Sequence, residues 1–292
     1  MLTDVVDLLV CPQCRVREVE SGLGLGETDR SLWCDRGHSF DVARQGYVSL
    51  LTGDGGKFAG DSAEMVTARE KFLGGGHFEP IAAAVSAAVP PESDVVLDVG
   101  VGTGYYLAGV LDARPAALGV GVDVSKFAAR RAARSHSRLG CVVADIWSGL
   151  PIRAGAVSAV TCVFSPRNAG ELHRVLGDDG TLVVVTPTSR HQRELRGPLG
   201  LIGVEEDKTR RLGESLSGLF ESVAETPLEY SMMLSHNDIE ELIGMGPSIR
   251  HGDPDARSAA LKDLPDTVPV TASVTVSTYR KVSQPRRASA SL

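Results

Sequence analysis

Apolar residues between positions 93 and 187 form short strand-like runs that are separated by helix-like segments. The strand-like runs read VVLDVG, LGVGVDVS, GCVVADIW, AVSAVTCVFS and TLVVVTP, and the helix-like segments cover about 105–113, 126–138 and 171–176. This alternation predicts an α/β fold with a doubly wound, parallel sheet. Residues 268–280 alternate between apolar and polar side chains, which predicts a closing pair of strand segments.

Two helices are expected before this region, in a connector that covers residues 53–91. The first begins at Asp61 or Ser62, either of which can cap it, and runs to about Leu73. The second covers about 78–89, and Pro90 and Pro91 end it. Periodicity alone favours a structural linker. The alternative is that this connector lines a cleft through Asp61, Ser62, Met65, Arg69 and His77.

A glycine-rich turn follows the first strand-like run of the alternating region. Gly100, Gly102 and Gly104 have the spacing G-x-G-x-G, which differs from the G-x-G-x-x-G of dinucleotide-binding folds. Ligands of such sheets bind outside the carboxyl ends of the strands. Asp98 precedes this turn, where a carboxylate would repel a phosphate but could face a cationic group. We therefore predict an S-adenosylmethionine site.

Two further acidic residues fall at strand ends and extend this prediction. Asp123 ends the second strand, where a carboxylate accepts ribose hydroxyls. Asp145 follows the third strand and could accept the adenine amino group, with Ile146 and Trp147 against the ring. The predicted cofactor-binding residues are Asp98, Gly100, Gly102, Gly104, Tyr105, Tyr106, Asp123, Asp145 and Ile146.

The loop after the fourth strand should lie beside the transferred methyl group. Its residues Phe164, Ser165, Pro166 and Asn168 are candidates for holding a planar base, although a plain turn and helix cap explains them equally well. No proton acceptor can be assigned, and the acidic and imidazole candidates are Asp61, His77 and His191. For phosphate contacts, Arg190, Arg193 and Arg196 are better placed than the stripe formed by Lys126, Arg130, Arg134 and Arg138.

Four potential zinc ligands lie near the amino terminus. Cys11, Cys14, Cys34 and His38 form the pattern C-x2-C-x19-C-x3-H. Two short-spaced ligand pairs at this distance can converge on one tetrahedral zinc, and four protein ligands leave no open position for catalysis. The alternatives are a redox C-x-x-C or chance placement. We expect a structural zinc in a module of residues 1–52, since so small a core needs a metal.

Composition and charge restrict the function classes further. The 292 residues are 42% hydrophobic, include five cysteines and carry a formal net charge of −7, which argues against a large generic nucleic-acid surface but not against a local one. No apolar run reaches the ~18 residues of a membrane span, and the first residues lack the basic segment of a signal peptide. We expect a soluble, cytoplasmic protein with no membrane partner, a catalytic domain over 92–284 and a disordered tail over 285–292.

Three stretches together resemble the bacterial 23S ribosomal RNA guanine-N1 methyltransferases. They are C-P-x-C…C-x-x-x-H-S-F-D-x-A-x-x-G-Y-V-x-L-L at 11–51, GDSAEM followed by A-R-x-x-F-L-x-x-G-H-F-x-P at 60–80, and L-D-V-G-x-G-x-G-Y-Y at 97–106 with D-V-S at 123–125. The resemblance covers nearly the whole chain and is looser after Gly200. One departure is S-P-R-N at 165–168, where relatives often have A-P-C-K.

This resemblance implies a class I, Rossmann-like methyltransferase with a seven-stranded mixed sheet and a zinc module that engages RNA. It also implies a homodimer, a target guanine in a hairpin loop of 23S rRNA, and a place in the branch that confers resistance to tylosin-type macrolides. Alternatives are a small-molecule methyltransferase with a zinc lid and an inactive ribosome-binding zinc protein. We also expect Cys14→Ser to lose zinc and RNA methylation while it keeps cofactor binding.

Overall fold

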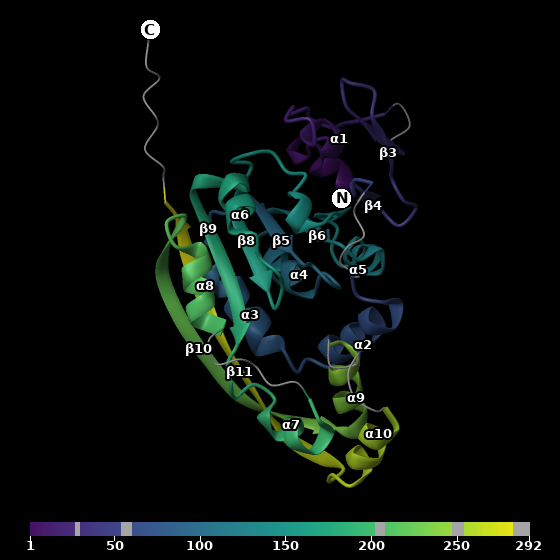
Figure 1. Cartoon of the computed structure of the whole chain (residues 1–292), viewed down its shortest axis with the longest axis vertical. Helices are drawn as coiled ribbons and strands as arrows, with labels where there is room; N and C mark the ends of the chain where they lie inside the picture. The colour runs from purple at the N-terminus through teal and green to yellow at the C-terminus, as the bar shows by residue number, and fades with distance from the viewer. Residues whose placement is uncertain (27–29, 54–59, 202–207, 247–253, 283–292) are drawn as a thin grey trace.

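The computed structural model describes residues 1–26, 30–53, 60–201, 208–246 and 254–282. Its centre is a mixed sheet of eight strands in the order β10-β11-β9-β8-β5-β6-β7-β4 (Figure 1). These strands are β4 (Tyr47–Ser49), β5 (Val95–Val99), β6 (Leu118–Asp123), β7 (Leu139–Val143), β8 (Val157–Val163), β9 (Leu176–Pro187), β10 (Phe220–Ser235) and β11 (Thr267–Lys281). Strands β4 to β9 run parallel to one another, and β10 and β11 are antiparallel additions.

The seven strands expected for a class I methyltransferase are all present in this sheet. The eighth, β4, comes from the amino-terminal module and pairs in parallel with β7, with Val48 opposite Val142. The zinc module is therefore joined to the catalytic sheet through backbone hydrogen bonds. A separate three-stranded sheet of β1 (Gly24–Leu25), β2 (Ser31–Trp33) and β3 (Ser39–Asp41) belongs to the module alone.

Helices cover both faces of the large sheet because successive strand residues point in opposite directions. In β5, Val96 belongs to one buried cluster and Leu97 to the other. The first cluster includes side chains of α3 (Glu79–Ala88), α4 (Tyr105–Asp112), α5 (Lys126–Ala132), α7 (Arg193–Leu199) and α9 (His236–Gly244). The second includes side chains of η1 (Leu2–Asp4), η2 (Val6–Leu8), α1 (Pro12–Arg15), α6 (Ala169–Val175) and α8 (Lys208–Leu216).

The expected connector helices are found at α2 (Ala63–Gly74) and α3. Ser62 caps α2, since its side chain accepts a hydrogen bond from the Met65 backbone N–H. Helix α2 packs against α9, so the connector meets a distant part of the chain (Figure 1). Helix α10 (Pro254–Lys262) contacts α7.

Two sequence-based boundaries are wrong in extent. The helix expected over 126–138 ends at Ala132, and Arg138 instead donates to the backbone carbonyls of Arg114, Ala117 and Leu111. The pair of strand segments expected over 268–280 is the single strand β11, which is paired along its length with β10. The tail expected over 285–292 lies outside the described residues. Within the described residues, no helix has the length and apolar character that a membrane crossing requires.

Candidate active site and zinc site

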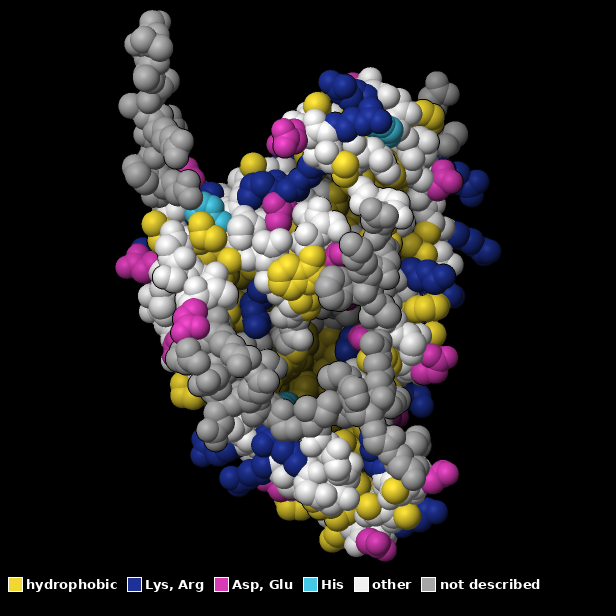
Figure 2. All heavy atoms as spheres, viewed as in Figure 1, with side chains coloured by type: hydrophobic (Ala, Val, Ile, Leu, Met, Phe, Trp, Pro, Cys, Tyr) yellow, Lys and Arg dark blue, Asp and Glu magenta, His cyan; other side chains and the backbone are white. Residues whose placement is uncertain are grey.

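A cavity of about 820 Å³ lies at the carboxyl ends of the parallel strands. Figure 2 shows it as a hollow with an apolar floor near the middle of this face of the molecule. Its walls come from α2, from the loops after β5, β6, β7, β8 and β9, and from the end of α9. This is the edge at which doubly wound sheets bind ligands.

The glycine-rich turn forms one wall of the cavity through Gly100 and Gly102. Gly100 has φ +75° and lies so close to Ser165 that a Cβ there would be 2.5 Å from the serine Cβ. Only glycine fits both the backbone angle and this approach. Gly104 also has positive φ but packs against Ser135, behind the residues that line the cavity.

Asp123 faces the cavity and is fixed by the turn. Its Oδ2 accepts from the Gly102 N–H at 2.9 Å, and its Oδ1 accepts from the Ser125 N–H at 2.8 Å. Burial raises the pKa of this carboxyl, and the two backbone hydrogen bonds oppose the rise. The carboxylate is therefore oriented before any ligand arrives.

Asp98 lies beneath the wall rather than on it. Only 2% of its surface is exposed, and Thr161 Oγ1 donates to its Oδ1 at 2.8 Å. Burial raises the pKa of Asp98 to about 7, the hydrogen bond from Thr161 opposes that rise, and the charge of Asp123 adds to it. Any influence of Asp98 on a ligand passes through the turn above it.

The predicted adenine residues lie together in the cavity wall. Asp145 caps the short helix η3 (Ile146–Ser148), since its Oδ1 accepts from the Trp147 N–H at 2.9 Å and its Oδ2 accepts from Ser148 Oγ at 3.2 Å. Asp145, Ile146 and Trp147 all line the cavity. The structure thus brings together two carboxylates and an apolar surface at neighbouring strand ends.

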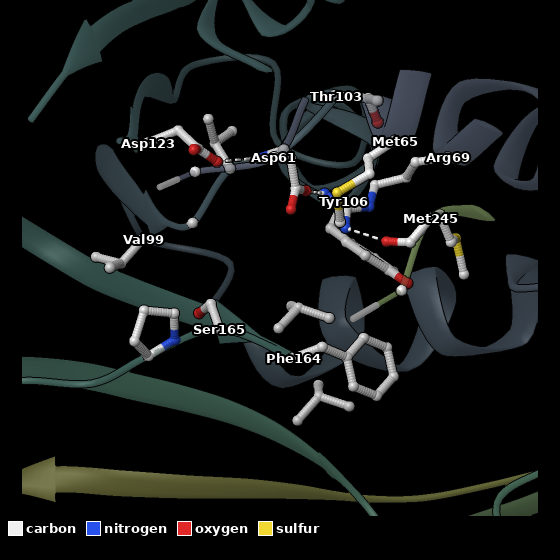
Figure 3. A pocket seen from close by; sticks show the side chains of 18 of the residues that line it. Asp61, Met65, Arg69, Val99, Thr103, Tyr106, Asp123, Phe164, Ser165 and Met245 are labelled. Atoms are coloured by element: carbon white, nitrogen blue, oxygen red, sulfur yellow. Dashed lines mark hydrogen bonds and ion pairs between the residues drawn. The ribbon is translucent and has the colours of Figure 1, made fainter. Parts of the chain in front are cut away.

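Helix α2 contributes Arg69 to the cavity wall, although periodicity alone had favoured a purely structural connector. Arg69 forms an ion pair with Asp61, and its Nη2 donates to the Met245 carbonyl at 2.8 Å (Figure 3). A Cβ on Gly102 would lie 3.4 Å from Arg69 Nη1. Asp61, Met65 and Arg69 line the cavity, whereas Ser62 caps α2. In the sequence, only the A-R pair of the motif at 60–80 pointed to a role for Arg69.

Aromatic and imidazole rings gather around Phe164 in the cavity wall. The centroid of Phe164 lies 6.1 Å from that of Phe78, 5.9 Å from that of His191 and 6.5 Å from that of Tyr106. Phe164 has φ +54°, a left-handed backbone angle that is costly for a bulky side chain. Its exposed fraction is 40% and it lines the cavity, so a residue with a strained backbone presents its ring there.

Two buried hydroxyls lie in the same part of the wall. Ser165 Oγ and Thr186 Oγ1 have no hydrogen-bond partner among the described residues, and both residues line the cavity. Thr186 was not singled out in the sequence, where it reads as one more residue of an apolar strand. Buried polar atoms without partners are costly, and a side-chain rotation would bring either oxygen to the cavity surface.

His191 borders this region and is held neutral. Its Nδ1 accepts from the Ser273 N–H at 3.1 Å, which assigns the ring proton to Nε2. Burial lowers the pKa of His191 to about 4, and the charge of Arg196 adds to this effect. Of the other proposed proton acceptors, Asp61 is paired with Arg69, and His77 lies outside the wall, 3.3 Å from Asp238.

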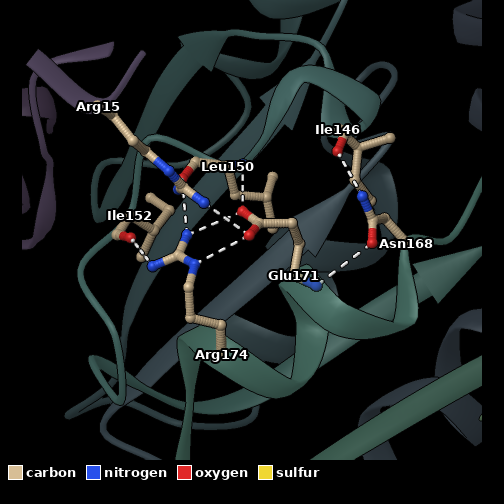
Figure 4. A network of polar contacts seen from close by, with 7 residues as sticks. All are labelled: Arg15, Ile146, Leu150, Ile152, Asn168, Glu171 and Arg174. Atoms are coloured by element: carbon tan, nitrogen blue, oxygen red, sulfur yellow. Dashed lines mark hydrogen bonds and ion pairs between the residues drawn. The ribbon is translucent and has the colours of Figure 1, made fainter. Parts of the chain in front are cut away.

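Asn168 lies outside the cavity wall, unlike Phe164, Ser165 and Pro166. Its Oδ1 accepts from the Glu171 N–H at 3.3 Å, which caps α6, and its Nδ2 donates to the Ile146 carbonyl at 3.2 Å (Figure 4). Asn168 is therefore a helix cap, as the alternative interpretation of this loop expected, and it does not line the cavity. Of the arginines proposed for phosphate, Arg190 pairs with Glu229, Arg193 pairs with Glu194, and Arg196 donates to the His191 carbonyl.

The four predicted zinc ligands converge at the amino terminus. The ligand atoms of Cys11, Cys14, Cys34 and His38 all lie within 4.8 Å of one another. Cys14 Sγ lies 3.8 Å from Cys34 Sγ and 3.4 Å from His38 Nδ1. A tetrahedron with Zn–S bonds of ~2.3 Å requires S–S separations of about 3.8 Å, so the set fits a structural zinc.

Comparison with known proteins agrees with both sites. Residues 9–53 match the family described as RlmA, N-terminal, a zinc ribbon, and residues 96–180 match the methyltransferase domain family. Among solved structures, a methyltransferase from Haloferax volcanii, in complex with the Trm112 methyltransferase activator, has a TM-score of 0.50. It is 15% identical, and the match covers 77% of this chain and 99% of that one, which supports the fold alone.

The fold and the two sites define an S-adenosylmethionine-dependent methyltransferase with a zinc ribbon. A 23S rRNA (guanine(748)-N(1))-methyltransferase of Streptomyces fradiae is 42% identical over 96% of this chain and 99% of its own length. A Micromonospora griseorubida protein named as a 23S rRNA (guanine-N(1)-)-methyltransferase is 43% identical over 97% of this chain and 100% of its own. The chain belongs to the family of 23S rRNA guanine-N1 methyltransferases.

Proposed function

We propose that this protein methylates N1 of one guanine in a hairpin loop of 23S rRNA, at the position equivalent to guanine 748. The observation that carries the proposal is the near-complete alignment with the Streptomyces fradiae enzyme, whose name specifies that guanine. The ring-lined end of the cavity supports a planar acceptor. Ribosomal RNA as substrate makes the cytoplasm the expected place of action.

The cofactor is proposed to lie along the wall formed by the glycine turn and the two acidic strand ends. Asp123 would accept the ribose hydroxyls, and Asp145 with Ile146 would hold the adenine ring. The other proposed contacts are Gly100, Gly102, Tyr105 and Tyr106, with Asp98 and Gly104 shaping the turn from behind. S-adenosylmethionine, when bound, supplies an electrophilic methyl group.

Arg69 is proposed to bind the carboxylate of the methionyl group. It is the lining cation that lies beside Gly102, whereas Arg167 belongs to the loop after β8. Asp61 holds the guanidinium in place by an ion pair. Arginine suits such a carboxylate because its planar fork can donate two parallel hydrogen bonds.

The guanine is proposed to lie against Phe164, with the hydroxyls of Ser165 and Thr186 as hydrogen-bond partners for its edge. An unpaired base can be stacked on an aromatic ring and read by polar groups at its edge. His191 Nε2 carries a proton at neutral pH and lies 3.0 Å from the side-chain amide of Gln192, so this ring is not proposed to accept the N1 proton. With Asp61 paired to Arg69, water is the proposed acceptor of that proton.

A methylation assay tests the proposal directly. Labelled S-adenosylmethionine and unmodified 23S rRNA should give labelled RNA, and primer extension should stop at one guanine. Cofactor binding without label in RNA would overturn the proposal and favour a small-molecule acceptor. Loss of both would indicate an inactive ribosome-binding protein.

Two wider properties follow from the family resemblance and are part of the proposal. Expression in a macrolide-sensitive bacterium should raise its resistance to tylosin-type macrolides, whereas Thr186→Val should abolish that protection if Thr186 holds the base.

A homodimer is also proposed. Light scattering coupled to size-exclusion chromatography should give twice the 30.8 kDa chain mass, and the monomer mass would contradict it.

A further inference from the structure

Residues 144–150 separate the cofactor cavity from the zinc ribbon. Ala144, Asp145, Ile146 and Trp147 line the large cavity. The other side of this segment borders a second hollow of about 120 Å³, which is lined by Arg15, Leu50, Asp145 and Gly149 among others. Ile146 and Leu150 belong to the same buried cluster as Cys14 and Leu50 of the ribbon, so the hollow interrupts a boundary that is otherwise apolar.

Arg15 contacts this segment from the zinc ribbon. It lies on α1, the short helix that also carries the zinc ligand Cys14. Arg15 Nη1 donates to the Leu150 carbonyl, and Arg15 Nη2 donates to Glu171 Oε1 at 2.6 Å (Figure 4). A Cβ on Gly149 would lie 3.2 Å from Arg15 Cζ, so the guanidinium also packs over this glycine.

Glu171 connects Arg15 to the same end of the segment, at Leu150. Its Oε2 accepts from the Leu150 N–H at 2.7 Å, and Arg174 donates to its carboxylate and to the carbonyls of Leu150 and Ile152. Burial opposes ionisation of Glu171, but hydrogen bonds from Arg174 and Arg15 outweigh it and lower the pKa to about 2. This carboxylate therefore stays charged and paired.

The first turn of α6 holds the near end of the same segment. Asn168, the cap of this helix, donates to the Ile146 carbonyl at 3.2 Å. Ile146 and Leu150 are thus fixed by one helix, and Arg15 is the contribution of the ribbon to that network. Asp145 and Ile146, which are proposed to hold adenine, lie at the start of this stretch.

We propose that Arg15 is a positioning residue for the cofactor, through which the folded zinc ribbon holds the adenine side of the cavity in its binding arrangement. Cofactor affinity then depends on zinc, although no zinc ligand reaches the cavity. This inference rests on the proposed cofactor site and departs from the expectation that Cys14→Ser keeps cofactor binding. The ribbon would serve the methyl donor as well as the RNA.

Calorimetric titration of the full chain with S-adenosylhomocysteine tests this inference. Arg15→Ala should weaken binding by about tenfold, the scale expected when one charge-assisted hydrogen bond is removed. Arg17→Ala is the matched control, because Arg17 lies two residues away in the zinc ribbon and is exposed. With saturating cofactor, Arg15→Ala should regain most of its kcat, so that the effect appears in KM for S-adenosylmethionine.

Removal of zinc is the second part of this test. Chelation should weaken binding by the parent chain to the level of Arg15→Ala and should weaken the variant little further, because both changes break the same connection. Trp147 fluorescence in a Trp33→Phe background reports on the adenine side directly. Arg15→Lys, which keeps the charge and loses the fork, should lie between parent and alanine variant and serves if the alanine variant fails to fold.

Equal affinity of Arg15→Ala, Arg17→Ala and the parent would overturn the inference, as would additive effects of chelation and Arg15→Ala. Absence of binding by the zinc-loaded parent would instead refute the proposed function.

Discussion

Two buried titratable side chains near the cavity respond to pH in opposite directions. The folded pKa of His191 is about 4, below the usual value, because burial disfavours its charged form. The folded pKa of Asp98 is about 7, above the usual value, also because of burial. Since both groups titrate between pH 4 and pH 7, their contributions to the unfolding free energy partly cancel in the parent protein.

The contribution of His191 can be isolated by substitution. As pH falls from 6.5 to 4, His191 binds a proton in the unfolded chain but not in the folded one, so this residue alone lowers the unfolding free energy by up to roughly 3 kcal/mol. His191→Gln should lack this loss. Urea unfolding of both proteins at intervals across this range would measure it, and parallel curves would contradict the assigned pKa.

Asp98→Asn should have the opposite effect. Above pH 4 the unfolded Asp98 ionises while the folded carboxyl stays protonated, so the parent loses stability as pH rises from about 4 to 7. The variant should be relatively more stable at pH 7 than at pH 4 in the absence of cofactor. Thermal melts at the two pH values provide the measurement, and Asp94→Asn, an exposed substitution near the start of β5, is the control.

Arg69 is expected to act on the cofactor alone. Arg69→Met should raise KM for S-adenosylmethionine by at least about tenfold, because a carboxylate would lose its charged partner. Lys71→Met changes an exposed cation of the same helix and should leave KM unchanged. Steady-state kinetics at varied cofactor would show the difference, and a changed KM for RNA with an unchanged KM for cofactor would refute the role.

At the scale of elements, the cap of α2 is expected to matter for stability. Ser62→Ala removes the acceptor for the Met65 N–H and should cost about 1 kcal/mol of unfolding free energy. Ser62→Asp keeps a capping oxygen and should restore it. Chemical denaturation measures the effect, and equal stability of all three proteins would show that tertiary packing alone fixes the helix.

Elements with a strong local pattern were predictable from sequence, and those defined by distant partners were not. The strands at 95–99 and 118–123 and the caps of α2 and α5 follow from nearby residues. Helix α5 ends at Ala132, and Arg138, which was expected to extend it, bonds to carbonyls between positions 111 and 117. The continuity of β11 depends on β10, about 45 residues earlier, which alternation alone does not reveal.

The same distinction applies to the cavity. Its glycines and strand-end carboxylates stand out in sequence because their spacing follows the turn and the strands. Thr186, Phe78 and the Arg15 network depend on tertiary contacts between segments up to 156 residues apart, so local pattern gave no reason to select them. Arg69 was visible only as an alternative because helical periodicity does not say which face meets a cavity.

At the scale of the molecule, ribbon and catalytic sheet are expected to unfold together. Val48 of β4 is fully buried, and Leu9 and Leu32 share a cluster with strands of the large sheet. Removing residues 1–52 should leave the edge of β7 unpaired and produce aggregation. Calorimetry of the full chain should show one transition that shifts down on chelation, whereas two separate transitions would contradict the shared core.

The pairing of β4 with β7 also sets an order of events during synthesis. The ribbon is complete once residue 49 has emerged, yet Cys141, Val142 and Val143, which pair with β4, are made more than 90 residues later. Zinc can be captured early, because its ligands end at His38. The nascent chain can therefore carry a zinc-bound ribbon whose strand β4 is still unpaired. The rate of translation between positions 50 and 143 then determines how long Val48 remains exposed to solvent.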